Sequence, residues 1–431
     1  MLRKSDLHGS VSDPVLDTMN FLNEITLRYP GALSFAPGRP YDGFFDVEQL
    51  FAHIRRYLGH LADEGSTPEQ IRTALYQYGP TAGQIRELIA HALRVDEDVR
   101  VPPESIVVTV GAQEGMLLVL RALFSAPEDV LLVSCPCYVG IIGAARLLNI
   151  AVEPVEERAD GLAVDDVRAA VRSARAAGLR PRALYVVPDH ANPSGTTLDL
   201  ASRHALLDLA ERDDLLILED SPYRLVSPGR PLPLLKSLDT AATVIHLGSF
   251  SKTVFPGART GFVVADQGVA GAGLLAAELA KIKSMVTVNT SSLGQAAVAG
   301  ALLASGGRIS ALNAAAAAHY GEAMRLTLRW LDRRMPAEWR AARGVDWNRP
   351  EGGFFLSVRV PFRADGAALE RSAREHGLLW TPMADFHPHE GGDRALRLSI
   401  SYLTPAEIEE GTARLARFID SEIAHQEGAV R

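Results

Sequence analysis

One short segment carries the residue types that covalent amine chemistry needs. Its run Ser249-Phe250-Ser251-Lys252 follows an apolar stretch, and Arg259 comes seven positions after the lysine. The chain has five lysines, of which only Lys252 lies between two hydroxyl side chains with an arginine nearby. A lysine amine forms a Schiff base with an aldehyde, and hydroxyl and guanidinium groups bind phosphate. The segment therefore predicts a lysine that holds a phosphorylated aldehyde, which is the chemistry of pyridoxal phosphate.

Other candidate groups follow further strand-like apolar runs. Gly111-Ala112-Gln113 opens a helical pattern, where free backbone N–H groups at a helix N-terminus would suit a phosphate. Tyr138 could stack on a flat heteroaromatic ring, although a tyrosine in such a place is more often part of a core. Each of these signals is weak alone, because similar turns open many helices in α/β proteins.

Amide, carboxylate and phenol side chains follow two more apolar runs. Asn192 lies in the turn-like stretch Pro188–Gly195, and Asp220 and Tyr223 come directly after the next run along the chain. Any one of these residues could simply belong to a loop. Their occurrence together, in this order and ahead of Lys252, indicates a common site.

The spacing of apolar residues indicates the elements that position these groups. Short apolar runs alternate with amphipathic stretches, which is typical of a mostly parallel sheet covered by helices on both faces, an α/β fold. Ligands bind such sheets outside the carboxyl ends of the strands. The expected strands are 106–110, 130–133, 183–187, 215–219, 243–247 and 261–264, and the expected helices include 114–124, 165–177 and 200–212.

The rest of the chain has a different pattern that predicts a smaller α+β domain. A long helix is expected over residues 308–334, then strands at 353–360 and 395–401 and helices at 367–376 and 405–419. We therefore expect an N-terminal segment, residues 1–50, packing on the small domain, a large cofactor-binding domain, residues 51–309, and an interdomain helix with the small C-terminal domain, residues 310–431.

Composition narrows the class of protein. The 44 basic and 52 acidic residues give a formal charge of −8, which argues against a nucleic-acid partner. No apolar run approaches the ~20 residues that cross a bilayer, and the N-terminus lacks the apolar stretch of a secretory signal. A cytoplasmic protein without membrane partners is therefore expected. Cys135 and Cys137 are too few for a disulfide framework or a zinc site, and we expect them to be reduced and buried.

Taken in order, the motifs resemble the class I and II aminotransferases of fold type I, which depend on pyridoxal phosphate. The shared motifs are Asn192-Pro-x-Gly, Asp220-x-x-Tyr, Ser249-x-Ser-Lys and the arginine seven positions on. Segments 33–38, 77–80 and 396–399 are similar to the aminoadipate and kynurenine transaminase branch. The resemblance implies an enzyme that exchanges an amino group between an L-amino acid and a 2-oxo acid by a ping-pong mechanism.

The resemblance implies a role for each motif residue. Lys252 would form the Schiff base and move a proton between substrate and cofactor, and Asp220 would keep the pyridine nitrogen protonated. Tyr223 and Asn192 would bind the phenolic oxygen of the cofactor, and Tyr138 would stack on its ring. The expected phosphate ligands are Gly111, Ala112, Gln113, Ser249, Ser251 and Arg259.

Substrate and partner residues are implied in the same way. Arg397 is expected to hold the substrate α-carboxylate, because a guanidinium fork meets a carboxylate bidentately, and the alternative is an ion pair on an edge strand. Gly38 and Asn192 are expected beside the substrate. Tyr78 is expected to reach the phosphate site of the neighbouring subunit, which implies a homodimer with two-fold symmetry.

Several positions depart from the family pattern and leave the substrate open. Ala112 stands where relatives often have a phosphate-binding serine, and the stretch Asp13–Leu27 lacks the arginine that aminoadipate specialists use. Arg39 stands where an apolar residue is common. Our hypothesis is that Arg39 meets the side-chain carboxylate of a glutamate donor, and a plain surface arginine is an equal alternative.

The loop of residues 382–389 lacks the Pro-Gly of relatives and could reshape the pocket. Asp385 and Glu390 would suit a basic side chain, such as that of a guanidino 2-oxo acid of the enduracididine type in antibiotic pathways. His387 and His389 could be metal ligands, but a His-x-His in a loop is more often surface or lid, and no metal is predicted.

Two other classes of function compete with amino-group transfer. A β-eliminating lyase, a cyclising synthase or an oxidase could use the same fold and cofactor, because a fold does not decide the reaction. A transcriptional regulator with an aminotransferase-like domain would need an additional DNA-binding domain, for which the early start of the resemblance leaves no room.

Overall fold

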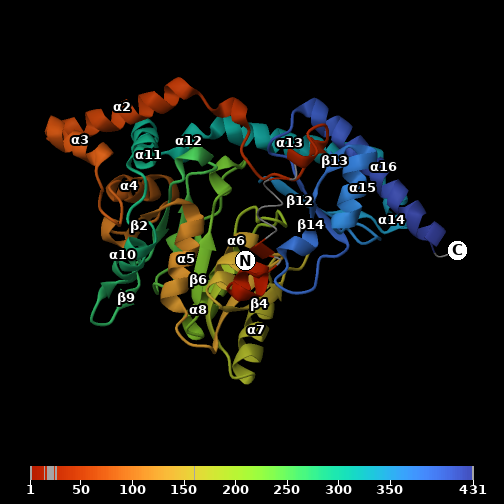
Figure 1. The fold of residues 1–431 in the computed structure, drawn as a ribbon, viewed down its shortest axis with the longest axis horizontal. Coiled ribbons are helices and arrows are strands. Elements are labelled where there is room, and N and C mark those ends of the chain that lie inside the picture. Colours follow the sequence, from red (N-terminus) through yellow and green to blue (C-terminus); the bar gives the residue numbers. More distant parts are fainter. Residues whose placement is uncertain (1, 14, 17–23, 25–26, 160, 430–431) are drawn as a thin grey trace.

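A sheet of seven strands forms the centre of the larger part of the molecule (Figure 1). The computed structural model describes residues 2–13, 15, 16, 24, 27–159 and 161–429. The strands are β2 (Ile106–Thr109), β3 (Asp129–Cys135), β4 (Ala151–Glu156), β5 (Arg180–Val186), β6 (Leu216–Asp220), β7 (Val244–Ser249) and β8 (Gly261–Val264). They lie in the order β2-β8-β7-β6-β5-β3-β4, and only the pairs that include β8 are antiparallel. The predicted mostly parallel α/β sheet is confirmed.

One strand of this sheet, β4, was not among those expected. It lies at the edge of the sheet beside β3, and its residues alternate between buried and exposed. An edge strand contacts only one neighbour, so it needs no continuous apolar run and tolerates Pro154 in its middle. The search for continuous apolar runs therefore missed it.

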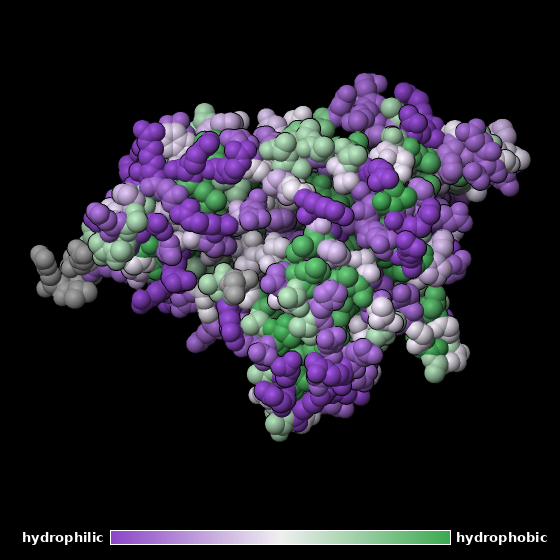
Figure 2. All heavy atoms as spheres, turned by 180° about the vertical axis from the view of Figure 1, so that it is seen from behind, coloured by the Kyte–Doolittle hydropathy of each residue, from purple (hydrophilic) through white to green (hydrophobic). Residues whose placement is uncertain are grey.

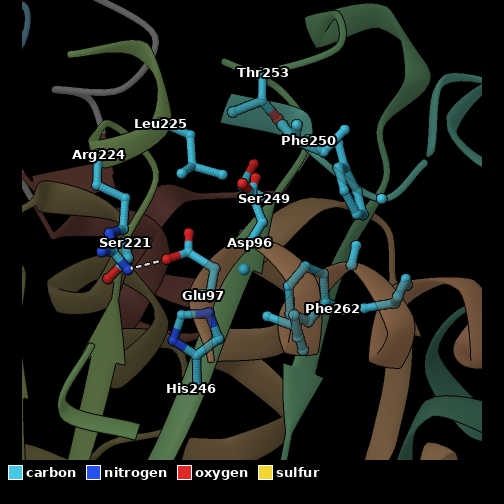
Figure 3. Close-up of a pocket in the computed structure, with 16 residues that line it drawn as sticks. Asp96, Glu97, Ser221, Arg224, Leu225, His246, Ser249, Phe250, Thr253 and Phe262 are labelled. Atoms are coloured by element: carbon cyan, nitrogen blue, oxygen red, sulfur yellow. Dashed lines mark hydrogen bonds and ion pairs between the residues drawn. The ribbon is translucent and has the colours of Figure 1, made fainter. Parts of the chain in front are cut away.

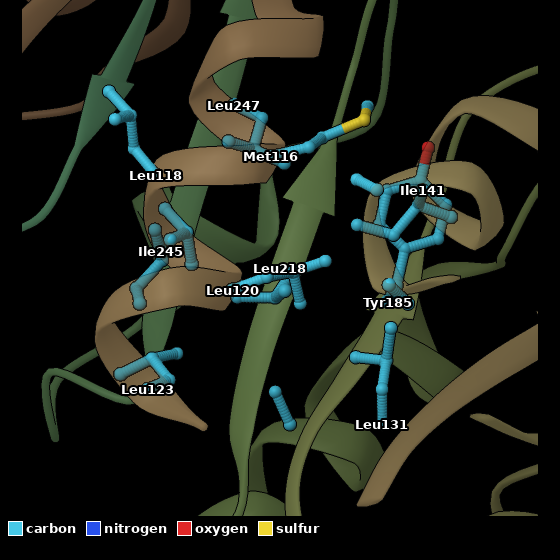
Figure 4. Packing of buried hydrophobic residues seen from close by; sticks show 14 of the residues in the cluster. Met116, Leu118, Leu120, Leu123, Leu131, Ile141, Tyr185, Leu218, Ile245 and Leu247 are labelled. Carbon is cyan, nitrogen blue, oxygen red and sulfur yellow. The ribbon is translucent and has the colours of Figure 1, made fainter. Parts of the chain in front are cut away.

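Helices cover both faces of the sheet. The first face carries α5 (Gly111–Leu123), α6 (Val139–Leu147) and α10 (Leu275–Val286), and Figure 4 shows Leu120 of α5 beside Leu218 of β6. The opposite face carries α7 (Val164–Ala176) and α8 (Leu200–Arg212). Tyr185 belongs to the first apolar cluster and its neighbour Leu184 to the second, as expected when successive strand residues point to opposite faces.

A third group of helices extends beyond β2 and β8. It consists of α2 (Val47–Asp63), α3 (Pro68–Tyr76), α4 (Arg86–Glu97) and α11 (Ser292–Ala304). Elsewhere in the large part are the short helix α9 (Leu235–Leu238) and the hairpin of β9 (Gly268–Val269) and β10 (Gly273–Leu274). The helix α2 packs along α11 (Figure 1). None of the helices in the described ranges is long and apolar enough to cross a membrane.

The C-terminal part contains a smaller antiparallel sheet in the order β11-β12-β15-β14 (Figure 1). Its strands are β11 (Asp346–Trp347), β12 (Phe355–Arg359), β14 (Thr381–Pro382) and β15 (Ala395–Ser399), and its helices are α13 (Ala314–Arg334), α14 (Ala337–Arg343), α15 (Gly366–His376) and α16 (Pro405–Ala429). The predicted α+β pattern is present. The division of the chain at residues 50 and 309 stays a prediction.

The beginning of the chain contacts both parts. Strand β1 (Leu33–Ser34) pairs in parallel with β13 (Leu378–Leu379) of the small domain. Further upstream, Asp13 forms an ion pair with Arg146 of α6, whose atoms lie 3.5 Å apart. The N-terminal segment therefore touches the large sheet domain as well as the small one.

The long helix expected over residues 308–334 is divided. A short helix, α12 (Ile309–Leu312), precedes α13, and Asn313 lies between them. The buried amide of Asn313 donates hydrogen bonds to the carbonyl oxygens of Thr253, at 2.8 Å, and of Ile309, at 3.0 Å. Asparagine side chains compete for backbone partners in this way, and a helical pattern alone does not reveal the break.

The close packing of α2 on α11 gives a test of the fold. A Cβ atom on Gly300 would lie 1.9 Å from the backbone oxygen of His53, whereas a Cβ on Gly59 of α2 would meet nothing within 4 Å. We expect Gly300→Ala to destabilise the protein by at least ~2 kcal/mol through overpacking. We expect Gly59→Ala to stabilise it by ~0.5–1 kcal/mol through helix propensity.

Thermal unfolding of the two apoprotein variants at one protein concentration checks this expectation. Equal melting temperatures for Gly300→Ala and the unmodified chain would show that α2 does not pack on α11 as described.

Candidate active site

A cavity of about 490 Å³ lies at the carboxyl ends of the parallel strands, where the sequence placed the site. It is lined by several strand ends, loops and the start of α5 in the large domain, by β12 and β15 of the small one, and by Leu27 and the segment after β1. The predicted residues that line it are Gly38, Arg39, Ala112, Gln113, Tyr138, Asn192, Asp220, Tyr223, Ser249, Ser251, Lys252, Arg259 and Arg397. Ala36 and Arg397, which are 361 positions apart, thus meet in one place.

Lys252 lies in the loop after β7, between the two domains. Its amine donates a hydrogen bond of 2.8 Å to the backbone oxygen of Gly38. Burial, followed by the positive charges of Arg259 and Arg397, lowers the pKa of Lys252 to about 8, against the opposing effect of Asp220. Near neutral pH a larger fraction of this amine is therefore uncharged than in an ordinary lysine. The uncharged amine is the form that attacks a carbonyl.

Asp220 ends β6 and is nearly inaccessible to solvent. Its Oδ2 accepts a hydrogen bond of 2.7 Å from the hydroxyl of Tyr185. Its Oδ1 is buried and has no hydrogen-bond partner among the residues that the structure describes. Burial raises the pKa of Asp220 to about 6, and the bond from Tyr185 acts in the opposite direction. A free carboxylate oxygen in this position fits the protonated ring nitrogen of pyridoxal phosphate.

An anion-binding corner lies at the start of α5. Gly111 has a φ of +71°, and a Cβ there would lie 2.6 Å from Nη2 of Arg259, so only glycine fits. Arg259 donates to the hydroxyl of Ser251 at 3.4 Å and has no carboxylate partner in the described part of the chain. A helix N-terminus, two hydroxyl groups and an unpaired guanidinium together fit a phosphate group.

Arg397 reaches the cavity from β15 of the small domain and is 2% exposed. Its guanidinium donates to the side chains of Asn192, at 2.9 Å, and Thr381, at 3.1 Å, and to the backbone oxygen of Ala36. The rings of Phe355 and Phe386 lie 4.6 and 4.8 Å from its central carbon. Burial lowers the pKa of Arg397 to about 10, so it stays charged at neutral pH.

Two aromatic side chains complete the walls of the cavity. Tyr223 is buried, bonds to the side chain of Asn192 and meets the ring of Phe355 edge-on, with the ring centres 5.4 Å apart. The hydroxyl of Tyr138 donates to the side-chain oxygen of Gln113 at 3.4 Å. Burial raises the pKa of Tyr138 to about 12.

A smaller cavity lies behind Ser249, on the far side of the strand ends (Figure 3). The figure shows Arg224 directed toward Glu97 of α4, with which it forms a buried ion pair. Burial raises the pKa of Glu97 to about 8, and Arg224 opposes this shift. Because Arg224 directly follows Tyr223, this ion pair holds the loop that carries the tyrosine.

Several residues of the site were not predicted from the sequence. Tyr185 and Phe355 lie in expected strands whose apolar pattern does not mark them as site residues, Thr381 lies in β14, where no strand was expected, and Glu97 belongs to no motif. A signal did exist for Tyr185, because a phenol in an otherwise apolar buried strand needs a hydrogen-bond partner. No comparable signal marks Glu97.

Three predicted residues lie away from the cavity centre. Gly111 supports the cavity without lining it, as its contact with Arg259 shows. Tyr78 is 83% exposed and does not line the cavity of its own chain. Arg39 is exposed at the cavity mouth, with its guanidinium 4.1 Å from the ring centre of Tyr402. Most of the stretch from Asp13 to Leu27 lies outside the described residues.

The loop after β14 contacts the large domain through its two histidines. His387 Nδ1 lies 3.3 Å from the Sγ atom of Cys135, and His389 Nε2 lies 3.1 Å from the backbone oxygen of Val152. Both cysteines are free and buried, as predicted. Cys135, Glu156 and His387 bring three possible ligand atoms within 4.8 Å of one another, so the expected absence of a metal stays a prediction.

Comparison with known proteins agrees with this geometry. The family model for aminotransferase class I and II matches residues 62–415. The (S)-3,5-dihydroxyphenylglycine transaminase of Amycolatopsis orientalis is 47% identical, with 98% of this chain and 95% of that protein aligned.

Solved structures give the same result. An archaeal alanine:glyoxylate aminotransferase superposes with a TM-score of 0.83 at 25% identity and covers 98% of this chain and 100% of its own. The alpha-aminoadipate aminotransferase of Thermus thermophilus, complexed with N-(5'-phosphopyridoxyl)-L-leucine, has a TM-score of 0.78 at 31% identity, with 94% and 95% covered.

These findings confirm the predicted family, its similarity to the aminoadipate branch and the cofactor. The three relatives are all named as enzymes that transfer an amino group, which favours the aminotransferase prediction over a lyase, synthase or oxidase. The chain belongs to the class I and II aminotransferases, enzymes that use pyridoxal phosphate to exchange an amino group between an amino acid and a 2-oxo acid.

Proposed function

We propose that Lys252, Asp220, Tyr223 and Arg397 carry the reaction and that the amino acid substrate has an aryl side chain. The observation that carries the proposal is one cavity that contains a buried amine, a carboxylate with a free oxygen and an anion-binding corner. When bound, pyridoxal phosphate accepts the amino group and withdraws electrons from the substrate Cα, which makes the Cα–H bond acidic.

The residues divide the work of binding and proton transfer. Lys252 would hold the cofactor covalently, and once released from that link its amine would move a proton between the substrate Cα and the cofactor C4′. Asp220 stabilises the positive ring nitrogen through Oδ1. Tyr223 and Asn192 bind the phenolic oxygen, while Tyr138 covers one face of the ring.

The corner at the start of α5 would hold the cofactor phosphate. Its ligands in this proposal are the backbone N–H groups of Gly111, Ala112 and Gln113 and the side chains of Ser249, Ser251 and Arg259. Ala112 supplies no hydroxyl, so the guanidinium of Arg259 makes a larger contribution than in a site with a serine there.

Arg397 binds the α-carboxylate of both substrates. In the described structure its guanidinium is already fixed by Asn192, Thr381 and two aromatic rings, so little ordering is required when a carboxylate arrives. Because Arg397 belongs to the small domain and Lys252 to the large one, a bound substrate connects the two domains.

The substrate side chain is proposed to be aryl, as in the 47% identical dihydroxyphenylglycine transaminase. Apolar side chains of Met116, Val187 and Phe355 line the cavity beside its polar groups, which suits an aromatic ring. Dihydroxyphenylglycine is not a coded amino acid, and we therefore place the enzyme in specialised metabolism of the kind that supplies antibiotics. Gly38 would lie beside the substrate, because it lines the cavity together with Phe355.

The second half-reaction is proposed to use glutamate, with Arg39 as the partner of its side-chain carboxylate. Arg39 lies at the mouth of the cavity and has no ion pair with any described residue. The alternative is a guanidino substrate, which Asp385 favours. Burial raises the pKa of Asp385 to about 6, and the nearby Arg397 opposes the shift.

We further propose a homodimer in which Tyr78 completes the phosphate site of the partner. Its side chain is exposed, and so are other large apolar side chains of the large domain, namely Tyr76, Met285, Val286, Val288 and Leu293. The face seen in Figure 2 likewise has hydrophobic residues gathered near its centre. A cytoplasmic location, where thiols stay reduced, would suit the free Cys135 and Cys137.

The lowered pKa of Lys252 predicts how the apoprotein captures pyridoxal phosphate. The uncharged amine is the reactive form, so the capture rate should rise with pH and level off above about 8, instead of rising beyond pH 10. Stopped-flow absorbance gives the rate, and borohydride trapping locates the link. Lys252→Ala should form no trapped link and lose activity by more than 1,000-fold, as an order of magnitude for a lost nucleophile.

A panel of amino acids without acceptor tests the substrate proposal. Conversion of the cofactor to its pyridoxamine form should be fastest with (S)-3,5-dihydroxyphenylglycine. L-phenylglycine, the matched compound without hydroxyls, should be slower by about tenfold, since unpaired polar groups in a site cost affinity. If L-arginine reacts best, the guanidino alternative replaces the aryl substrate. Release of ammonia over many turnovers would contradict transamination itself.

Arg39→Ala tests the glutamate hypothesis separately. Loss of one charge-assisted contact should lower kcat/KM for glutamate by roughly tenfold, while kcat/KM for the aryl substrate changes little. Arg39→Lys, which keeps the charge, should recover part of the loss. An unchanged glutamate half-reaction in Arg39→Ala would leave Arg39 as a surface arginine.

A further inference from the structure

The phenol of Tyr185 lies behind the active site, inside the large sheet. Its ring is 1% exposed and packs in the apolar cluster of α5 and α6, where Figure 4 shows it beside Ile141 and Leu131. Strands β5 and β6 are parallel neighbours, and Tyr185 pairs with Leu218, two positions before Asp220. This register brings the hydroxyl within 2.7 Å of Asp220 Oδ2.

This hydrogen bond makes the two carboxylate oxygens of Asp220 different from each other. Oδ2 accepts the hydrogen bond from Tyr185 of β5, and Oδ1 has no hydrogen-bond partner among the described residues. Because Asp220 lines the cavity, Oδ1 is the oxygen that remains for a ligand there. The side chain is buried, so water does not compete for either position.

We propose that Tyr185 is a positioning residue that keeps Asp220 ionised and aims one of its oxygens at the ring nitrogen of the cofactor. This inference rests on the proposed role of Asp220 in binding that nitrogen. It concerns a residue that never touches the substrate and acts only through the carboxylate.

The direction of the hydrogen bond supports the ionised state. Burial and the negative charge of Asp220 hold the pKa of Tyr185 well above its ordinary value. The phenol therefore stays protonated and is the donor of the hydrogen bond. A carboxylate accepts this bond, and a donor to the charged form lowers a carboxyl pKa. Among the described residues no other group donates a hydrogen bond to this carboxylate, so burial would raise the pKa of Asp220 further if the phenol were removed.

Other groups around Asp220 set the rest of its electrostatic environment. Lys252 and His246 favour the ionised form, whereas Glu219 on the same strand disfavours it. These charges act without a direct hydrogen bond to the carboxylate, so they do not fix its orientation. The titratable groups that face Asp220 from the surrounding elements are Cys137, Tyr138, Tyr185, Glu219, Tyr223, His246 and Lys252.

The test uses full-length apoprotein in which Lys252→Ala makes cofactor binding non-covalent and removes titration of the lysine. Tyr185→Phe is compared with Tyr57→Phe, a buried tyrosine of α2 outside the cavity. Equilibrium dialysis measures the affinity for pyridoxal phosphate and for its deaza analogue, in which CH replaces the ring nitrogen. The analogue cannot pair with Asp220. The affinity for pyridoxal phosphate divided by the affinity for the analogue therefore reports on that contact alone.

We expect Tyr185→Phe to lower this ratio by about tenfold, the effect of one hydrogen bond to a charged group. The affinity for pyridoxal phosphate should fall on acidification at a pH about one unit higher than in Tyr57→Phe, because Asp220 is protonated earlier. In chains that retain Lys252, Tyr185→Phe should lower kcat about tenfold with little change in KM.

Each other outcome has a defined meaning. An equal loss of affinity for both compounds in Tyr185→Phe would mean that the phenol contributes only packing, and the inference would fail. Asp220→Asn serves as the reference for the proposed function. If it leaves the ratio unchanged, the role of Asp220 is wrong, and if it lowers the ratio while Tyr185→Phe does not, the error lies with Tyr185 alone.

Discussion

Burial of opposite charges in one small space is the constraint on which this active site depends. Lys252, Asp220 and Arg397 are all withdrawn from water, and burial shifts the pKa of each toward its neutral form. The negative charge of Asp220 favours the charged form of Lys252 and offsets part of that cost, whereas the positive charge of Arg397 disfavours it. A chain that lost the charge of Asp220 would leave Lys252 beside the positive Arg259 and Arg397 without that compensation.

The protein meets this constraint with side chains that lie one layer further from the cavity. Tyr185 bonds to Asp220, Thr381 bonds to Arg397, and the ion pair of Glu97 with Arg224 fixes the loop of Tyr223. These partners come from strands and helices of the two domains and not from flexible loops. Rigid elements of this kind hold a site within the narrow range of geometry that chemistry needs.

The sequence predicted the groups that face the cavity better than the groups that support them. Lys252, Asp220 and Asn192 directly follow buried strands, and parallel strands end at a common edge, so their meeting could be inferred. Tyr185, Thr381 and Glu97 act through contacts between elements distant in sequence, which no local pattern contains. The same limit explains the edge strand β4, which lacks an apolar run, and the helix break at Asn313, whose partner is the backbone of Thr253.

The segment after β1 has a consequence for how the chain acquires its activity during synthesis. Ser399 near the end of the chain donates to the backbone oxygen of Pro37, a contact between residues 362 positions apart. The sheet that holds the phosphate corner can form while the last part of the chain is still inside the ribosome, but Arg397 and its neighbours arrive only afterwards. A nascent or C-terminally truncated chain would therefore gather the groups for the cofactor before it could select a substrate. Until then β1 lacks β13, the strand with which it pairs, and an unpaired strand of this kind is a natural target for chaperones.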